Sequence, residues 1–229
     1  EYNLQDGCEF PLLTLRKTNW EKALDEILWI YQKKSNNVND LNSHIWDSWA
    51  DETGSIGKAY GYQCGVKYEY PDIGLTMDQV DRVLYDLKHD PASRRIMVNM
   101  WNPADLKDMH LAPCAYSLTF NVTGEYLNAI LNQRSQDMLT ASNWNVVQYS
   151  LLLMIIAQVT GFKAGKLIHV ISDCHIYDKH IPIVEELLDK ADQVFNTNPL
   201  IIGKDVIINP YITEFYEAKI DDMKIKNNK

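Results

Sequence analysis

Two stretches of the chain carry apolar residues at helical spacing on one face. Residues 18–34 form the first, and Thr18 or Asn19 is suited to cap its N-terminus. The pattern after Thr76 predicts the second, with Thr76 as its cap. Residues 179–192 are interpreted as a third helix.

A fourth helical stretch, residues 144–160, is apolar nearly all round and is therefore expected in the core. Asn143 is suited to cap its start, and Gly161 is suited to end it. The longest apolar run, residues 150–162, is too short to span a membrane and contains Gln158. The pattern thus predicts a buried helix and no membrane partner.

Short runs rich in β-branched and aromatic residues predict strands between these helices. Residues 95–101 form one run, and residues 114–122 and 125–134 predict a hairpin around Thr123-Gly124. Residues 165–177 predict another strand, and short strands are expected to close the chain. Because strands and helices mix without strict βαβ alternation, we expect the α+β class.

Composition suits one large domain or two small ones, since the 229 residues are 46% hydrophobic. The net charge of −9 and the lack of a long basic run argue against nucleic-acid binding through phosphates. No signal peptide is recognisable, and both ends look cut from a longer protein. The cysteines stand too far apart for a CxxC pair and are interpreted as reduced thiols of a cytoplasmic protein. They are Cys8, Cys64, Cys114 and Cys174.

A thiol and three guanidinium groups stand at the ends of predicted strands. Cys114 follows a proline, and it could be a buried structural thiol or a nucleophile whose thiolate is stabilised by nearby cations. Arg94 and Arg95 should point to opposite faces of a strand, so one could serve a site and the other a neighbour or a subunit interface. Surface salt bridges are the alternative for this pair. Arg134 offers a further bidentate phosphate ligand.

Polar side chains gather before the buried helix, in residues 133–145. Gln133 and Ser135, together with the arginine between them, can hold a phosphate and part of a base. Asp137 and Asn145 could read the edge of a heterocycle, because an amide both donates and accepts hydrogen bonds. This stretch predicts a nucleotide site.

Glu26 lies on the first helix, where it could form a surface salt bridge or be a buried acid with a raised pKa that moves protons. His175 and Tyr177 are two apart on a strand and could bind sugar hydroxyls. The spacing from these residues to His180 is not one that indicates a metal site.

The loop of residues 35–63 is long for a plain connection and is rich in aromatic residues. Trp46, Trp49 and Tyr60 could stack on a flat cofactor or pack in the core. The length of the loop favours a functional segment.

Several motifs stand in the order and spacing of one enzyme family, and they run from about Phe10 to the end of the chain. They are residues 26–31 (EILWIY), 45–63 (IWDSWADETGSIGKAYGYQ), 90–103 (DPASRRIMVNMWNP), 111–122 (LAPCAYSLTFNV), 133–138 (QRSQDM), 143–152 (NWNVVQYSLL), 172–180 (SDCHIYDKH) and 208–210 (INP). By these motifs the chain resembles the thymidylate synthase family.

The resemblance implies one domain over residues 1–229, in which helices flank a large mixed β-sheet and two copies pair back to back as a homodimer. It assigns Arg94 and Arg95 to the phosphate site of the partner subunit. The implied reaction is reductive methylation of dUMP to dTMP, with 5,10-methylenetetrahydrofolate supplying both the one-carbon unit and the hydride. No metal and no nicotinamide is implied.

The resemblance also implies roles in the reaction. Cys114 would add to C6 of uracil so that C5 can attack the one-carbon unit. Asn145 would hold the ring, Glu26 would organise proton transfer around O4, and Tyr60 would help to remove the C5 proton. For the nucleotide, Arg134 and Ser135 would bind phosphate with Gln133 nearby, and His175 and Tyr177 would hold the 3′-hydroxyl.

For the folate, the resemblance implies that Asp137 binds the pterin, that Trp46 and Trp49 line the pocket and that Leu111 packs beside it. Asn19 stands where the family often has a histidine that touches folate.

Some residues depart from the family pattern. Ala115 follows the thiol where histidine is frequent, and Ala141 replaces a common glycine near the folate. The family pattern places its first phosphate-binding arginine upstream of Glu1 and its closing tail after Lys229, so both are expected to be absent or to lie outside this chain.

Two alternatives follow from these departures. A dUMP hydroxymethylase would use the same thiolate and folate but let water capture the methylene intermediate. A non-catalytic nucleotide-binding protein would keep the fold without the turnover.

Overall fold

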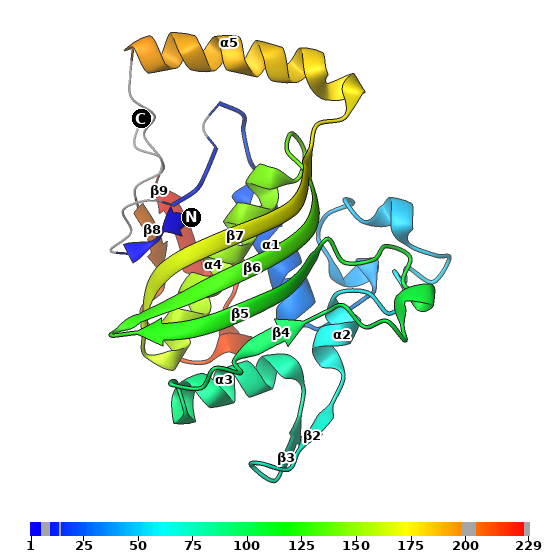
Figure 1. The fold of residues 1–229 in the computed structure, drawn as a ribbon, viewed down its shortest axis with the longest axis vertical. Coiled ribbons are helices and arrows are strands. Elements are labelled where there is room, and N and C mark those ends of the chain that lie inside the picture. Colours follow the sequence, from blue (N-terminus) through cyan, green and yellow to red (C-terminus); the bar gives the residue numbers. More distant parts are fainter. Residues whose placement is uncertain (6–9, 14, 198–204, 227–229) are drawn as a thin grey trace.

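The centre of the fold is a five-stranded sheet with the order β1-β7-β6-β5-β4 (Figure 1). The computed structural model describes residues 1–5, 10–13, 15–197 and 205–226. β6 and β7 run parallel and the other neighbours antiparallel, so the sheet is mixed and the expected α+β class is confirmed. The strands are β1 (Tyr2–Asn3), β4 (Met97–Asn99), β5 (Ala115–Thr123), β6 (Tyr126–Asp137) and β7 (Lys163–His175).

The expected hairpin of β5 and β6 is confirmed, and β6 continues beyond its expected end as far as Asp137. In the register, Ala115 lies opposite Gln133, and Asp137 lies opposite His175 on β7. The start of β5 therefore meets the ends of β6 and β7 at one end of the sheet. The polar residues of three separate motifs are brought together there.

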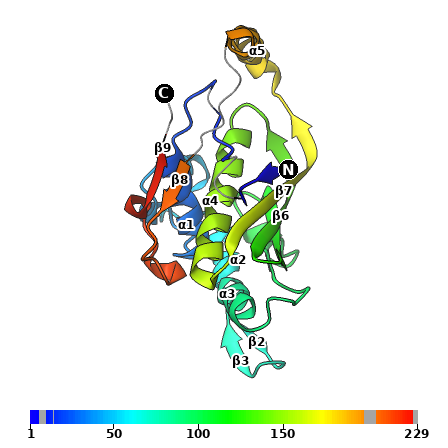
Figure 2. The same ribbon diagram turned by 90° about the vertical axis from the view of Figure 1, so that its left-hand side faces the viewer.

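Two long helices, α1 (Trp20–Tyr31) and α4 (Ser142–Thr160), lie on the same side of the sheet (Figure 2). α4 connects the parallel strands β6 and β7, and most of its residues are buried, as its apolar sequence predicts. The N-cap of α1 is Asn19, whose Oδ1 accepts the backbone N–H of Lys22 at 3.1 Å. Of the two expected caps, Asn19 is confirmed.

The expected cap of the second helix was wrong. This helix, α3, spans Gln79–His89, and Asp78 caps it by accepting the backbone N–H of Asp81 at 3.0 Å. Thr76 lies instead in a two-stranded antiparallel ribbon, because its backbone pairs with Glu69. The strands of the ribbon are β2 (Tyr68–Tyr70) and β3 (Leu75–Met77).

Asn143 is also not a helix cap. α4 begins one residue earlier, at Ser142, and no side chain caps it. The Asn143 Nδ2 donates to Thr18 Oγ1 at 2.8 Å and so ties the start of α4 to the segment before α1. Gly161 ends the helix in the left-handed conformation, with φ 82°, as expected.

The long loop contains short helical turns, and the helix expected over residues 179–192 begins after another such turn. In Figure 1, α5 lies at one end of the molecule, apart from α1 and α4. Strands close the chain as expected. The remaining elements are η2 (Val38–Asp40), η3 (Asp47–Trp49), α2 (Gly61–Gly65), η4 (Leu106–Asp108), η5 (Asp178–His180), α5 (Ile181–Thr197), β8 (Asp205–Ile208), η6 (Phe215–Glu217), η7 (Ile220–Asp222) and β9 (Met223–Lys226).

Within the described ranges, no helix has both the length and the apolar character that crossing a membrane requires.

Candidate active site

A cavity of about 530 Å³ lies where β5, β6 and β7 meet α1 and α4. It gathers most of the residues that the sequence nominated, from motifs spread over much of the chain. Those in its wall are Glu26, Trp46, Trp49, Tyr60, Leu111, Cys114, Gln133, Ser135, Asp137, Asn145, His175 and Tyr177. Four nominated residues do not line it, namely Asn19, Arg94, Arg95 and Arg134.

The thiol of Cys114 is free and partly exposed at the start of β5. Its backbone N–H donates to the hydroxyl of Tyr60 at 3.0 Å, and the Arg134 Nη2 lies 3.8 Å from its Sγ. The sulfur is therefore accessible from the cavity and has a guanidinium group beside it. Cys64 and Cys174 are also free, in agreement with the expected reduced thiols, while Cys8 lies outside the described residues.

Arg134 points to the opposite face of β6 from the cavity, because neighbouring residues of a strand alternate between faces. Its guanidinium donates to the carbonyl oxygens of Pro113 at 3.0 Å and Ala112 at 2.9 Å, and it lies 5.8 Å from the ring centre of Trp101. These bonds fix the segment that carries Cys114. The structure therefore places Arg134 next to the thiol, and on the other side of the strand from Ser135.

Glu26 is buried in the wall, which decides between the two interpretations of this residue in favour of a buried acid over a surface ion pair. Its carboxyl accepts the indole N–H groups of Trp46 at 2.8 Å and Trp144 at 2.5 Å. Burial raises the pKa of Glu26 to about 7, against the opposing effect of these two donors. A carboxyl with this pKa can both give and take a proton near neutral pH.

The raised pKa of Glu26 predicts a pH-dependent stability. The folded state holds this proton more tightly than the unfolded chain does, so the contribution is complete below about pH 4.5 and is lost as pH rises through about 7. Between pH 5 and pH 8, titration of Glu26 should lower the free energy of unfolding by about 2–3 kcal/mol, and we expect Glu26→Gln to remove this decline. Urea unfolding at both pH values measures the difference. Glu21→Gln, on the exposed side of α1, is the control, and equal declines in both variants would contradict the assignment.

Tyr60 holds an unusual backbone conformation, with φ 42°. Burial raises the pKa of its phenol well above the usual value, so the group stays protonated and remains a hydrogen-bond donor. The next residue must be glycine, because a Cβ on Gly61 would lie 2.0 Å from the carbonyl oxygen of Ser35. This close approach places the Tyr60 ring in the wall, beside Cys114.

Asn145 stands at the centre of a set of amides. Its Oδ1 accepts from Gln133 Nε2 at 3.3 Å and from Gln136 Nε2 at 3.4 Å, and its Nδ2 donates to Gln148 Oε1 at 3.0 Å. The Oε1 of Gln133 is 2.8 Å from His169 Nε2. Burial lowers the pKa of His169 to about 4, so the imidazole is neutral at pH 7 and donates this bond. The Asn145 amide thus has a defined orientation before any ligand binds.

Asp137 sits at the end of β6, where Thr140 and two backbone N–H groups hold its carboxyl. The N–H groups of Leu139 and Thr140 donate at 3.0 and 3.4 Å, and the Thr140 hydroxyl donates to the other oxygen. Burial acts to raise the pKa of Asp137, but these bonds outweigh it and the pKa is lowered. The carboxylate is therefore ionised and suited to accept from an N–H-rich ring.

The remaining wall of the cavity is aromatic and apolar. Trp46 is buried and Trp49 is 40% exposed, with 5.5 Å between their ring centres. Leu111 lies beside them in the wall. Rings at an open rim suit a flat heterocycle. Asn19 is exposed and acts as the cap of α1, outside this wall.

At another part of the rim, the rings of His175 and Tyr177 meet edge to face, 5.0 Å apart. His175 ends β7, and Tyr177 lies just beyond the strand, so the expectation that both belong to the strand was wrong for Tyr177. Arg94 and Arg95 are exposed and precede β4. They lie outside the cavity of their own chain.

Comparison with known proteins decides the family. The family model described as thymidylate synthase matches residues 1–229. The chain belongs to the thymidylate synthase family. It is 42% identical to a thymidylate synthase of Bacillus subtilis subsp. natto over 227 residues, which are 98% of this chain and 78% of that protein. It is 41% identical to thymidylate synthase 1 of Bacillus amyloliquefaciens, over 98% of this chain and 95% of that protein.

The fold agrees with this membership. The solved structure of thermostable thymidylate synthase A from Bacillus subtilis matches with a TM-score of 0.88 and 40% identity, covering 98% of this chain and 79% of that one. The resemblance seen in the motifs is confirmed. As a thymidylate synthase family member at this identity, the chain is a methyltransferase that converts dUMP to dTMP. These relatives do not favour the hydroxymethylase or the non-catalytic alternative.

Thymidylate synthases use a methylenetetrahydrofolate co-substrate, and this cavity fits one. The aromatic rim offers stacking surfaces, and the ionised Asp137 beside it offers an acceptor for the N–H groups of a pterin. Among the described residues, no group of three or more His, Cys, Asp or Glu side chains is placed to hold a metal ion.

Sequence reasoning missed four residues that line this cavity. Trp144 and Gln148 line the wall from α4, and Thr140 holds Asp137. Arg16 donates to the carbonyl oxygen of Leu139 at 2.7 Å and also lines the cavity. One signal was available for Gln148, because a polar residue within an apolar helix needs a partner.

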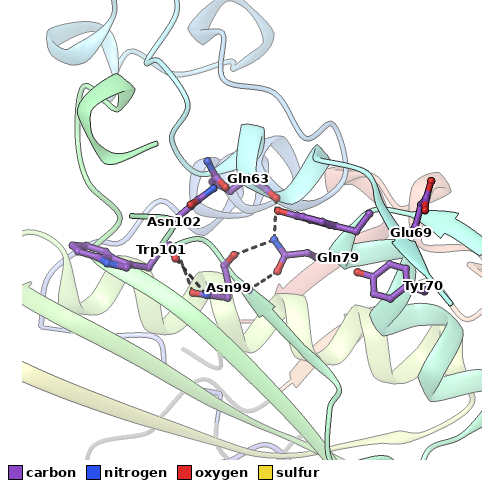
Figure 3. A pocket seen from close by; sticks show the side chains of 8 residues that line it. Gln63, Glu69, Tyr70, Gln79, Asn99, Trp101 and Asn102 are labelled. Atoms are coloured by element: carbon purple, nitrogen blue, oxygen red, sulfur yellow. Dashed lines mark hydrogen bonds between the residues drawn. The ribbon is translucent and has the colours of Figure 1, made fainter. Parts of the chain in front are cut away.

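A larger hollow, of about 620 Å³, lies outside this thymidylate synthase site, between the β2–β3 ribbon and the edge strand β4 (Figure 3). The side-chain amide of Gln79 in this hollow forms its hydrogen bonds with the protein backbone. Gln79 Nε2 donates to the carbonyl oxygens of Gln63 and Asn99, each at 3.0 Å, and its Oε1 accepts the Asn99 N–H at 2.8 Å. Gln79 thereby occupies the free edge of β4 as a neighbouring strand would.

Proposed function

We propose that this chain carries out the reductive methylation of dUMP with 5,10-methylenetetrahydrofolate through a covalent bond between Cys114 Sγ and C6 of uracil. The observation that carries the proposal is the convergence of a free thiol, a carboxyl with a pKa of about 7 and an oriented amide on one cavity. The folate supplies the one-carbon unit and the hydride.

Activation of the pyrimidine is the first task of the site. Cys114 adds to C6, which places negative charge on C5 and O4. Asn145 donates to the ring and stabilises this charge, and Glu26 delivers and removes a proton at O4. Loss of the C5 proton is assisted by the Tyr60 hydroxyl, and the thiolate is expelled when the C5–methyl group is complete.

Binding of the two substrates falls to separate parts of the wall. Ser135 and Gln133 face the nucleotide, and His175 and Tyr177 at the rim suit the 3′-hydroxyl. Asp137 accepts hydrogen bonds from the pterin, and the rings of Trp46 and Trp49 stack on the pterin. Arg134, on the opposite face of β6, holds the segment before Cys114 through its bonds to the carbonyl oxygens of Pro113 and Ala112.

We further propose a homodimer in which Arg94 and Arg95 serve the phosphate site of the partner subunit. Both side chains are exposed and adjacent, and neither reaches the cavity of its own chain. Guanidinium groups suit a phosphate dianion, and within the described residues the cavity of one chain has only Arg16 as an arginine or lysine in its wall. A mixed dimer of Cys114→Ala and Arg95→Glu chains should regain one active site, whereas either variant alone should be inactive.

Product analysis tests the overall reaction. Incubation of the protein with dUMP and methylenetetrahydrofolate should give dTMP and dihydrofolate in equal amounts. Formation of 5-hydroxymethyl-dUMP with tetrahydrofolate would contradict the proposal and identify water as the capturing group.

The Thr140 hydroxyl should matter for folate more than for dUMP. Thr140→Val removes a hydrogen bond to an ionised carboxylate, so we expect the KM for folate to rise roughly tenfold with little change in the KM for dUMP. Steady-state kinetics with each substrate varied in turn measures this. Thr53→Val removes a matching bond to Asp51 in the long loop, where neither residue lines the cavity, and is the control. Equal changes in both KM values would contradict the assignment of Asp137 to the pterin.

A further inference from the structure

We propose that Gln148 is a positioning residue that connects the pyrimidine-facing amide of Asn145 to the carboxyl of Glu26. The inference rests on the proposed roles of those two residues and adds a third one between them. Gln148 lies three positions after Asn145 on α4, hence on the same face of the helix, and only 2% of it is exposed. It lines the same cavity as Asn145 and as Glu26, which lies on α1.

The orientation of each amide follows from one backbone carbonyl. The Ser135 oxygen can only accept, and Gln133 Nε2 donates to it at 3.0 Å, which fixes the Gln133 amide. The same Nε2 faces Asn145 Oδ1, so Asn145 must present its Nδ2 to Gln148 Oε1. The Nε2 of Gln148 then points away from Asn145.

The Nε2 of Gln148 has no hydrogen-bond partner of good geometry among the described residues, although the atom is buried. A buried donor without a partner is costly, which indicates that the position has a use. Glu26 lines the same cavity, and Trp144, one helical turn before Gln148 on α4, donates to its carboxyl at 2.5 Å. In agreement with this placement, the Gln148 amide is one of the groups that lower the pKa of Glu26. A small rotation of the amide makes Nε2 a third donor to Glu26, after the two indoles.

The groups that act on Glu26 come from three elements. Asp25 on the same helix raises the pKa of Glu26. Tyr60 from the loop and Tyr149 from α4 face it as neutral phenols, since the pKa of each is raised by burial. Ala115, after the thiol, has no polar side chain to offer. Gln148 therefore supplies a hydrogen-bond donor that can connect the carboxyl of Glu26 to the amide of Asn145.

Variants at position 148 separate this role from plain packing. Gln148→Met keeps the length of the side chain and removes its donor and acceptor, so the pKa of Glu26 should rise. In the pH dependence of kcat for dUMP, the limb that belongs to Glu26 should move up by about half to one pH unit, and kcat should fall about tenfold with a smaller change in KM. The preference for dUMP over dCMP should also weaken, because Asn145 loses its partner.

Gln148→Glu supplies a graded second test, since a new carboxyl near Glu26 should move the limb further in the same direction. Gln158→Met is the matched control. It removes another glutamine of α4, whose Nε2 binds the carbonyl oxygens of Asn209 and Ile212 outside the cavity. This control should leave the pH profile unchanged.

The outcomes separate the inference from the proposed function. If Glu26→Gln abolishes the limb while both Gln148 variants keep the wild-type profile, the inference is overturned and the role of Glu26 stands. If Glu26→Gln itself keeps the limb, the proposed role of Glu26 fails, and the inference fails with it. Circular dichroism verifies folding, and if Gln148→Met does not fold, the isosteric Gln148→Glu decides the question alone.

Discussion

Replacing the Cys114 sulfur by oxygen should remove turnover and leave nucleotide binding measurable. In Cys114→Ser, kcat should fall on the order of 10³-fold or more, because a serine hydroxyl is scarcely ionised near neutral pH and no described base lies against it. The hydroxyl is smaller than the thiol, so dUMP should still fit the wall. Steady-state turnover and equilibrium binding of dUMP measure the two properties separately.

Cys174→Ser is the matched control for this variant. Cys174 is a free thiol on β7, exposed and outside the cavity wall, so its loss should leave kcat within about twofold. Turnover retained in Cys114→Ser would place the nucleophile elsewhere. Loss of dUMP binding together with turnover would mean that the thiol mainly supports the shape of the wall.

The second large effect is expected at the base-reading amide. Asn145→Asp replaces the Nδ2 donor by an oxygen, so the side chain can accept from the 4-amino group of cytosine or, when protonated, donate to its ring nitrogen. We expect the ratio of kcat/KM for dUMP to that for dCMP to fall about 100-fold, because a site built for one pattern of donors rejects the other. Parallel assays with the two nucleotides measure the ratio.

Asn143→Asp is the control for this change in specificity. Asn143 lies two residues away and binds Thr18, so its replacement alters the start of α4 without facing the base. It should lower stability and leave the ratio unchanged. An unchanged preference for dUMP in Asn145→Asp would mean that Asn145 does not read the ring.

Periodic segments of the sequence predicted the fold best. The all-round apolar pattern of 144–160 gave the buried α4, and Gly161 gave its end, because packing and a left-handed turn leave strong local signals. Caps were less certain. Thr76 and Asn143 are both reasonable caps by residue type, yet tertiary contacts with Glu69 and Thr18 decided their positions.

The candidate site was predicted as a set of residues and not as a geometry. Of the residues in the motif 133–138, Gln133, Ser135 and Asp137 line the cavity, whereas strand alternation turns Arg134 to the opposite face of β6; their roles in binding stay predictions. Gln148 and Trp144 escaped notice because their importance depends on Glu26, which lies more than a hundred residues earlier in the chain. Such a pairing exists only after the chain folds.

The most direct test of the account is the covalent bond to Cys114. The protein should be incubated with 5-fluoro-dUMP and methylenetetrahydrofolate, denatured, and analysed by mass spectrometry of the intact chain and its peptides. Fluorine at C5 cannot leave as a proton does, so the account predicts a stable adduct on the peptide that contains Cys114 and none in Cys114→Ala. An unmodified wild-type chain, or an adduct that persists in Cys114→Ala, would contradict the central claim.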